Sequence, residues 1–167
     1  MVSHGAIAMP GMTNPMDALI ALQVAIDQKR IELEPCYIHR ELRFIADEPG
    51  GRLRLTYASI RAGQVQSISS FVLVDPVEGI PCFQIGCAVV ESKRRQGLGS
   101  EIVAKGIEEL HSGFKRQGIP KLYVEAFVEV SNTASNRLAR RVLSDPRSSG
   151  VDAFSGDPAL QYLKLVE

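Results

Sequence analysis

The sequence predicts a single α/β domain, of the α+β kind, built on a mixed and mostly antiparallel central sheet. From residue 52 to residue 90, short apolar stretches alternate with turn residues, which is typical of an antiparallel meander. Residues 83–130 combine a strand, a glycine-containing turn, a helix and a second strand, and such a unit normally forms a right-handed parallel crossover. At 167 residues the chain fits one domain. We expect this domain to cover residues 14–167, after a flexible N-terminal tail over residues 1–13.

The N-terminal half should contain one helix and four strands. Asn14-Pro15 starts the helix, with Asn as N-cap and Pro at the first position, and the helix should end near Lys29. Residues 36–46 fit both a strand and a helix, and we favour a strand. Alternating or apolar patterns predict further strands, separated by turn residues, over residues 52–57, 65–73 and 83–90, with a turn at 48–51 and a loop at 75–81.

The C-terminal half continues with a strand over Leu122–Val130. Ser131-Asn132 then caps a helix whose inner face should carry Ala134, Leu138 and Val142 and which should stop near Ser144. Residues 147–158 are rich in Ser, Gly, Asp and Pro and predict a loop, with one short strand at Val151–Phe154. Leu160–Val166 closes the chain as a strand.

The composition is that of a soluble globular protein, with 45% hydrophobic and 23% charged residues. The 19 basic and 19 acidic side chains give a formal net charge of zero, which argues against a general nucleic-acid-binding protein. No stretch reaches the roughly 18 apolar residues of a membrane span, and the N-terminus lacks the pattern of a signal peptide. We therefore expect neither nucleic acid nor membrane as a partner.

The three cysteines, Cys36, Cys82 and Cys87, form no C-x-x-C motif and are odd in number. A disulfide framework and a zinc site are therefore not expected, and we predict no metal. Cys82 and Cys87 bracket a predicted buried strand, where we interpret them as small core residues. The simplest compartment for such a chain is the reducing cytoplasm.

The chain is organised around the turn Val89–Ser100, between a predicted strand and a predicted helix. The turn places two glycines and two arginines at the helix start, where backbone N–H groups are free and the helix dipole is positive. Glycine lets an anion approach these N–H groups, and arginine adds charge and forked donors. The helix itself follows from apolar residues at helical spacing, namely Val103, Ile107, Leu110 and Phe114. This arrangement predicts a diphosphate-binding turn.

Two other phosphate-binding turns fit the sequence less well. A P-loop requires a lysine and a hydroxyl residue directly after its second glycine, but Gly99 is followed by Ser100 and Glu101. The dinucleotide fingerprint requires three glycines, and only two are present. A nucleotide-binding turn therefore stays as a minor alternative.

The pattern that does fit is Arg-x-x-Gly-x-Gly, formed by Arg94, Gly97 and Gly99. It resembles the acyl-CoA-binding motif of the GCN5-related N-acetyltransferase (GNAT) family. In that family the amides of the turn grip the pyrophosphate of coenzyme A. Gly97 should then face the pyrophosphate with no room for a Cβ.

A second motif, Asn-x-x-Ser-x-x-Leu, strengthens the resemblance. It is formed by Asn132, Ser135 and Leu138 at the start of the second predicted helix. The elements predicted over residues 52–166, about two thirds of the chain, follow the family order throughout. The resemblance implies the acyl-CoA N-acyltransferase (GNAT) fold, with helices on both faces of the sheet, in one N-acetyltransferase domain. Residues 1–13 depart from the family, because they offer no strand before the first helix.

The resemblance also implies a function, an N-acetyltransferase that uses acetyl-CoA as co-substrate. A primary amine would attack the thioester directly in a ternary complex, in the gap between two splayed parallel strands, while a backbone amide near Val89 polarises the carbonyl. Asn132 and Ser135 resemble residues that touch the pantetheine arm or the thiol. The backbone of Ala88, Val89 and Val90 resembles the edge that pairs with pantetheine, and the pyrophosphate cradle would comprise Arg94, Arg95, Gln96, Gly97, Leu98, Gly99 and Ser100.

The proton-transfer groups do not carry over from the family. Ala139 stands where many members have a tyrosine that protonates the departing thiolate, and Phe83-Gln84 stand where many place a glutamate. Glu125 and Glu129 lie on one face of the next strand and are candidate general bases. A solvated or salt-bridged strand face explains these two glutamates at least as well.

Other titratable residues are weaker candidates for catalysis. Tyr57 and Tyr123 could donate a proton, but core aromatic residues are the better interpretation of both. Among the histidines, His39 lies in the uncertain segment, His111 on a polar helix face and His4 in the tail.

Two functions remain after this reading. The first is acetyl transfer to a small-molecule amine or a protein amine, with acceptor choice expected in the first helix, residues 31–48 and residues 147–158. The second is a non-catalytic acyl-CoA-binding sensor or interaction protein of the same fold, which the alanine at position 139 and the missing glutamate suggest. The resemblance also implies a homodimer, because the family often dimerises through its C-terminal strands, and Leu160–Val166 is an apolar terminal strand that would otherwise form a sheet edge.

Overall fold

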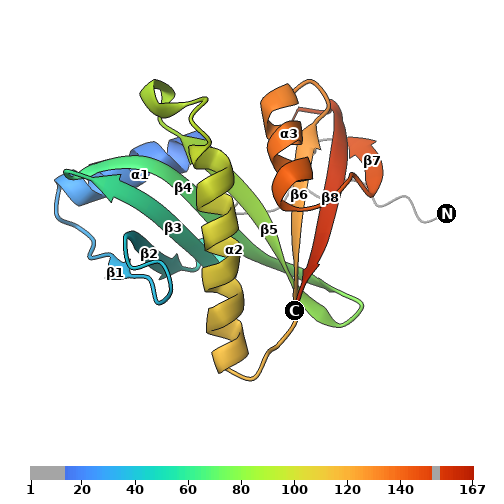
Figure 1. Cartoon of the computed structure of the whole chain (residues 1–167), viewed down its shortest axis with the longest axis horizontal. Helices are drawn as coiled ribbons and strands as arrows, with labels where there is room; N and C mark the ends of the chain where they lie inside the picture. Colours follow the sequence, from blue (N-terminus) through green and yellow to red (C-terminus); the bar gives the residue numbers. More distant parts are fainter. Residues whose placement is uncertain (1–13, 152–154) are drawn as a thin grey trace.

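The computed structural model describes residues 14–151 and 155–167 and places one eight-stranded sheet at the centre of the molecule (Figure 1). The strand order is β1-β2-β3-β4-β5-β6-β8-β7. β5 and β6 pair in parallel, and every other neighbouring pair is antiparallel. The strands are β1 Glu34–Pro35, β2 Leu42–Asp47, β3 Arg54–Arg61, β4 Gln64–Val77, β5 Ile80–Val89, β6 Leu122–Glu129, β7 Ser148–Val151 and β8 Pro158–Val166.

Helices cover both faces of the sheet. α1 (Pro15–Asp27) packs on one face, and α2 (Leu98–Arg116) and α3 (Thr133–Val142) pack on the other (Figure 1). Two short 3-10 helices, η1 (Pro49–Gly51) and η2 (Glu91–Lys93), lie in the connections. The predicted fold class, a mixed and mostly antiparallel sheet with helices on both faces, is therefore confirmed.

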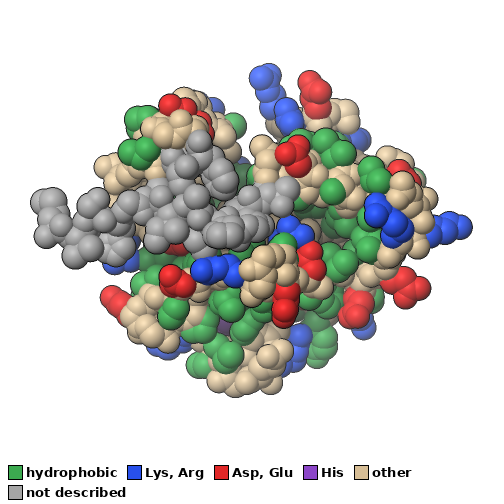
Figure 2. Space-filling view, turned by 180° about the vertical axis from the view of Figure 1, so that it is seen from behind, with side chains coloured by type: hydrophobic (Ala, Val, Ile, Leu, Met, Phe, Trp, Pro, Cys, Tyr) green, Lys and Arg blue, Asp and Glu red, His purple; other side chains and the backbone are tan. Residues whose placement is uncertain are grey.

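Each face has its own hydrophobic core, since successive side chains of a strand point to opposite sides. Phe71 and Phe83 are fully buried under α2 and α3, whereas Ile68 and Ala88 are buried under α1. Burying one large apolar side chain contributes roughly 1.5–3 kcal/mol to stability. On the face visible in Figure 2, basic and acidic side chains are interspersed, as expected for zero formal net charge.

The cap of the first helix is as predicted, because the Asn14 side chain accepts a hydrogen bond from the Met16 amide at 2.9 Å. The helix ends at Asp27, two residues before the predicted end. Of the ambiguous segment 36–46, only the part from Leu42 is strand.

The loop predicted over residues 75–81 is wrong, because β4 and β5 form a tight hairpin there. Glu78 and Gly79 make the turn, with φ of 52° and 77°. Two positive φ values match the right-handed twist of a two-residue hairpin. The prediction of a loop rested on Pro76, because proline has no N–H to donate to a β-ladder. In the structure Pro76 is tolerated, because it lies where the pairing shifts register between Val74 and Val77.

Two further expectations in the C-terminal half need correction. Ala134 is exposed, whereas Leu138 and Val142 of the predicted inner face do pack against the core, and the buried residue of α3 is Ala139. β8 is a sheet edge only in part, since β7 pairs with its outer side over residues 158–161 and not over residues 162–166. The short strand begins at Ser148, before the predicted Val151–Phe154, and residues 152–154, like the tail 1–13, lie outside the described residues.

Candidate functional site

The parallel strands β5 and β6 separate soon after they meet, and the gap between them opens toward η2 and the start of α2 (Figure 1). Their pairing is confined to residues 82–84 of β5 and 123–125 of β6, although both strands run on. The gap therefore leaves one backbone edge of β5 unpaired between Ile85 and Val89.

Backbone amides of β5 point into this gap. The Val90 amide donates to the Gln66 carbonyl on β4 at 3.0 Å. Because orientation alternates along an antiparallel strand, the backbone groups of Val89 and Cys87 point to the other side, toward β6. The Arg94 side chain supports this, since its Nε donates to the Val89 carbonyl at 3.2 Å.

The turn after β5 presents a row of backbone donors. No described residue provides an acceptor for the amides of residues 95–100, and the first intrahelical bond runs from the Glu101 amide to the Gly97 carbonyl at 3.1 Å. These six amides lie at the positive end of the 19-residue helix α2, next to the side chains of Arg94 and Arg95. The predicted cradle residues are thus brought together in a form that suits an anion.

The two glycines of the turn serve different purposes. Gly97 has φ of 78°, a left-handed conformation that side chains disfavour. No atom of the described residues lies within 4 Å of the position of a Gly97 Cβ, so the lack of room expected there would have to come from the pyrophosphate itself. Gly99 is the crowded one, since a Cβ there would lie 2.9 Å from Leu138 Cδ1 and 3.6 Å from Val89 Cγ2. Gly99 therefore lets α2 approach α3 and β5.

Asn132 and Ser135 lie across the gap, at the start of α3. The Asn132 side chain caps the helix by accepting from the Ser135 amide at 3.1 Å. The sequence analysis missed the neighbouring Asn136, whose Nδ2 donates to the Glu129 carbonyl at 2.8 Å and whose Oδ1 accepts from the Tyr162 hydroxyl at 2.6 Å. Asn136 thereby fixes α3 to β6 and β8, and its position one residue after the Ser of the motif was the available signal.

Glu125 lies on β6 where the two strands separate. Burial raises the pKa of its carboxyl, and a hydrogen bond from Gln161 Nε2 at 3.1 Å partly offsets this. Glu129 lies four residues further along the same face, about 13 Å away at ~3.3 Å per residue. The two candidate bases therefore lie too far apart to act on the same atom.

The tyrosines are poorly placed as proton donors. Tyr57 is 5% exposed within the core, and burial raises its pKa. The Tyr162 hydroxyl already donates to Asn136. Tyr123 lies on the half-buried outer face of β6. Ala139, which stands where many family members have a tyrosine, is 2% exposed and packs in the core, so it provides no proton donor.

Cys87 lies close to the turn, with its Sγ 3.9 Å from the Gly99 carbonyl oxygen. Burial raises the pKa of its thiol to about 12, so the thiol stays protonated at neutral pH. Cys36 and Cys82 are buried and have pKa values raised in the same way. None of the three is therefore an activated nucleophile.

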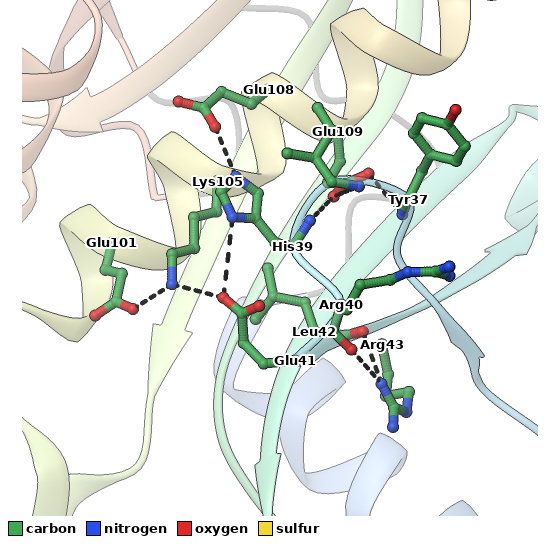
Figure 3. Close-up of polar contacts among 11 residues, drawn as sticks. Tyr37, His39, Arg40, Glu41, Leu42, Arg43, Glu101, Lys105, Glu108 and Glu109 are labelled. Carbon is green, nitrogen blue, oxygen red and sulfur yellow. Dashed lines mark hydrogen bonds and ion pairs between the residues drawn. The ribbon is translucent and has the colours of Figure 1, made fainter.

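The histidines belong to other parts of the molecule. His39 lies in the β1–β2 loop, where its Nε2 is 2.6 Å from Glu108 Oε2 on α2 (Figure 3). In the same loop the amides of Tyr37, Ile38 and His39 donate to the buried carboxylate of Glu109. His111 Nε2 lies 2.9 Å from the Pro120 carbonyl oxygen. His4 falls outside the described residues.

A surface hollow of about 420 Å³ lies along the C-terminal half of α2, between Ile38 and Arg116, away from the turn. Within residues 14–151 and 155–167, no three His, Cys, Asp or Glu side chains gather as metal ligands would. No helix in these ranges is long and apolar enough to cross a bilayer.

No model of a known protein family matches the sequence, and no curated protein matches it. Solved structures do match. A GNAT-family acetyltransferase from Streptococcus pneumoniae has a TM-score of 0.52 and 16% identity, over 68% of this chain and 67% of that chain. A ribosomal-protein-alanine N-acetyltransferase from Brucella melitensis has a TM-score of 0.52 and 24% identity, over 70% of each chain.

RimL, described as a ribosomal L7/L12 α-N-protein acetyltransferase, matches in two forms. The complex with coenzyme A has a TM-score of 0.52 and 22% identity, over 68% of this chain and 62% of RimL. The apo form has a TM-score of 0.50 and 16% identity, over 96% of this chain and 91% of RimL. In the RimL–CoA alignment the matched part is thus less than two thirds of RimL. At these identities the matches show the fold.

Proposed function

Because the chain has the fold of the GNAT acetyltransferases, we propose that it is an N-acetyltransferase that moves an acetyl group from acetyl-CoA to a primary amine. The observation that carries the proposal is the row of six amides, at the open end of the gap between β5 and β6, for which the described residues provide no acceptor. A helix start of this kind binds phosphate groups. An unpaired strand edge leads directly away from it, which suits a ligand with a diphosphate followed by an extended amide-containing arm.

In this proposal the pyrophosphate of acetyl-CoA lies on the amides of residues 95–100, beside the side chains of Arg94 and Arg95. The pantetheine arm adds to β5 as an extra strand along the backbone of Ala88, Val89 and Val90. Asn132 and Ser135 border the arm from the α3 side. The thioester then lies deeper in the gap, near the last paired residues, Gln84 and Glu125.

The chemistry proposed is direct attack by the amine on the thioester carbonyl. A backbone amide that points into the gap stabilises the negative charge that develops on the oxygen. The amide of Cys87 lies about 10 Å along β5 from Gln84, whereas that of Val89 lies about 16 Å away, so Cys87 fits this position of the thioester better. Glu125 takes the proton from the ammonium form of the acceptor. Its raised pKa brings it closer to neutral pH, as general-base catalysis requires. Glu129 is disfavoured, since it lies about 13 Å further from the point where the strands separate.

The second candidate function is acyl-CoA binding without turnover. It is favoured by one observation, the buried Ala139 where a proton donor would stand, together with the engaged hydroxyl of Tyr162. A CoA thiolate can take its proton from water or from the attacking nitrogen, so the missing tyrosine weakens the enzyme proposal without removing it.

The acceptor, oligomer and compartment are part of the proposal as well. The Brucella enzyme and RimL are named for acetylating ribosomal proteins, which supports testing peptide N-termini beside small-molecule amines. A homodimer through the edge of β8 would use residues 162–166, because β7 pairs with residues 158–161. The three free cysteines suit a reducing cytoplasm.

The test is thiol release from acetyl-CoA with a panel of small-molecule amines and N-terminal peptides, alongside calorimetry with CoA, ATP and NAD. Turnover of an acceptor at an ordinary enzymatic rate supports the transferase and removes the sensor. Tight CoA binding with no turnover on the whole panel supports the sensor. Binding of ATP or NAD without CoA would show that the turn serves another ligand.

A further inference from the structure

Gln84 and Glu125 are the last pair of neighbours before β5 and β6 separate. The preceding residue of β5, Phe83, packs against Phe114 of α2 with ring centroids 5.2 Å apart. Val124 of β6 is buried in the same core. Because side chains alternate along a strand, Gln84 and Glu125 both point to the opposite face, the one on which α1 lies.

The pair ends a row of polar side chains across this face. Gln161 on β8 donates from Nε2 to Glu125 Oε2 at 3.1 Å, and its Oε1 accepts from the Ser148 hydroxyl on β7 at 2.8 Å. Both ends of the Gln161 amide are therefore engaged. At the other end of the row, the Oε1 of Gln84 is buried and has no hydrogen-bond partner among the described residues.

A buried carbonyl oxygen without a donor destabilises the folded state, and such groups are rare in folded proteins. Its position is informative, because Gln84 is the register partner of Glu125, whose carboxyl has a raised pKa, at the closed end of the gap. Glu125 itself has one oxygen, Oε1, that no described residue engages. Two side chains on paired strand positions thus each have an acceptor oxygen without a donor among the described residues, which an amine would supply.

We propose that Gln84 binds the nitrogen of the acceptor amine through its Oε1, and so orients the lone pair of that nitrogen toward the thioester. This inference rests on the proposed acetyltransferase function. It makes Gln84 a substrate-binding residue of the site and gives the acceptor a required property, an N–H that remains after one proton is lost.

The proton and bond changes balance around this pair. The ammonium form of the acceptor gives one proton to Glu125, and one remaining N–H donates to Gln84 Oε1. The nitrogen lone pair forms the new N–C bond, the C–S bond then breaks, and the sulfur keeps that electron pair. The second proton of the nitrogen goes to the CoA thiolate, and Glu125 returns its proton to water, leaving an amide and CoA thiol.

A glutamine suits this position better than a glutamate would. An amide carbonyl accepts the N–H of the neutral amine without stabilising the ammonium form, which has no lone pair. A second carboxylate beside Glu125 would hold the amine protonated and would also raise the pKa of its neighbour. Replacing Gln84 by glutamate should therefore slow acetyl transfer near neutral pH.

The experiment compares Gln84→Met, which keeps the length and removes the polar atoms, with Gln84→Glu. Gln66→Met on β4 is the matched control. For an acceptor that the wild-type protein turns over, Gln84→Met should lower kcat/KM by about tenfold and leave the CoA affinity within about twofold. Gln84→Glu should shift the alkaline-rising limb of the pH profile of kcat/KM to higher pH. The control should show neither effect.

The outcomes separate this inference from the proposed function. Turnover by wild type with unchanged kcat/KM in Gln84→Met, or an unshifted pH profile in Gln84→Glu, overturns the role of Gln84 alone. CoA binding without turnover by the wild-type protein overturns the transferase and this inference together. If Gln84→Met does not fold, the pH profile of Gln84→Glu decides, because a purely structural role would not move it.

Discussion

Helix α2 lies next to two groups of backbone amides, and the described residues provide an acceptor for only one of the two groups. The amides of Tyr37, Ile38 and His39 surround the carboxylate of Glu109, which is 5% exposed, at 3.1, 2.7 and 2.5 Å (Figure 3). The amides of residues 95–100, at the start of the same helix, have no acceptor in the described structure. The two groups lie about 16 Å apart along the helix, at 1.5 Å per residue.

The comparison shows how to tell a structural arrangement of amides from a ligand-binding one. Successive N–H groups that converge form a concave site for an anion, whichever anion it is. Around Glu109 the anion is part of the chain, so the site holds the β1–β2 loop against α2. At the turn the anion must come from outside, and the positive φ of Arg95 and Gly97 keeps the amides exposed.

The largest expected effect on stability comes from removing the carboxylate that the amides of residues 37–39 contact. Glu109→Ala removes the only carboxylate that the three amides of the loop contact, and should destabilise the protein by about 3 kcal/mol. CoA affinity of the folded fraction should stay within about twofold, because the turn is distant. Urea unfolding measures the first and calorimetry the second. Glu108→Ala, which removes an exposed partner of His39, is the control and should cost less than about 1 kcal/mol. Equal losses for the two variants would contradict the role assigned to Glu109.

The next largest effect, on CoA affinity, comes from changing the backbone conformation of the turn that carries the amides of residues 95–100. Gly97→Val should lower CoA affinity by at least about tenfold, or ~1.4 kcal/mol. A branched side chain disfavours the φ of 78° and therefore turns the amides away from their common direction. The matched control is Gly63→Val, since Gly63 has φ of 75° and equally open surroundings in the β3–β4 turn. Calorimetry with CoA measures affinity, and circular dichroism checks folding. A folded Gly97→Val variant that binds CoA as wild type does would remove the turn from the binding site.

A smaller effect is expected from the charge beside the amides of residues 95–100. Arg94→Ala should weaken CoA binding, and more at low salt than at high salt, because an exposed charge acts through a screened field. Part of the loss would come from the Val89 carbonyl, which loses the Arg94 donor. Arg61→Ala, an exposed arginine at the end of β3, is the control. CoA titrations at two salt concentrations test this, and a loss independent of salt would mean that Arg94 acts through structure alone.

Much of this comparison could be predicted from sequence, and the reason differs between the two groups. The turn was recognisable because its amides, glycines and arginines are consecutive in the chain. The Glu109 group joins residues 70 to 72 positions apart, which no local pattern reveals. The loop 36–41 was ambiguous for the same reason, since a distant side chain holds its backbone.

The candidate catalytic residues show the same limit. Glu125 was one of two equivalent glutamates in the sequence. They differ only through the register of β5 and β6 and through the Gln161 contact across β8. Gln84 was noticed only as a missing glutamate, because its unpaired oxygen is a property of the folded sheet.

The carboxylate of Glu125 has fewer hydrogen-bond donors than that of Glu109. Glu109 accepts from three amides, whereas Glu125 accepts from one side-chain amide and is largely desolvated. Burial therefore raises the pKa of Glu125 above its ordinary 4.5. A carboxyl with a raised folded-state pKa holds its proton more tightly in the folded state. Its stabilising contribution is present below about pH 4.5 and is lost as the pH rises through the folded-state value.

The smallest prediction follows from this sign. Glu125→Gln keeps the shape and cannot ionise, so the free energy of unfolding of the variant minus that of wild type should rise as the pH increases above about 4.5. Urea unfolding at several pH values measures the difference, and Glu129→Gln, at the far end of the same strand face, is the matched control. A difference that falls with rising pH would mean that Glu125 is stabilised as the anion. The protein would then stabilise the Glu125 anion as it does that of Glu109. The raised pKa, which supports Glu125 as a general base near neutral pH, would be contradicted.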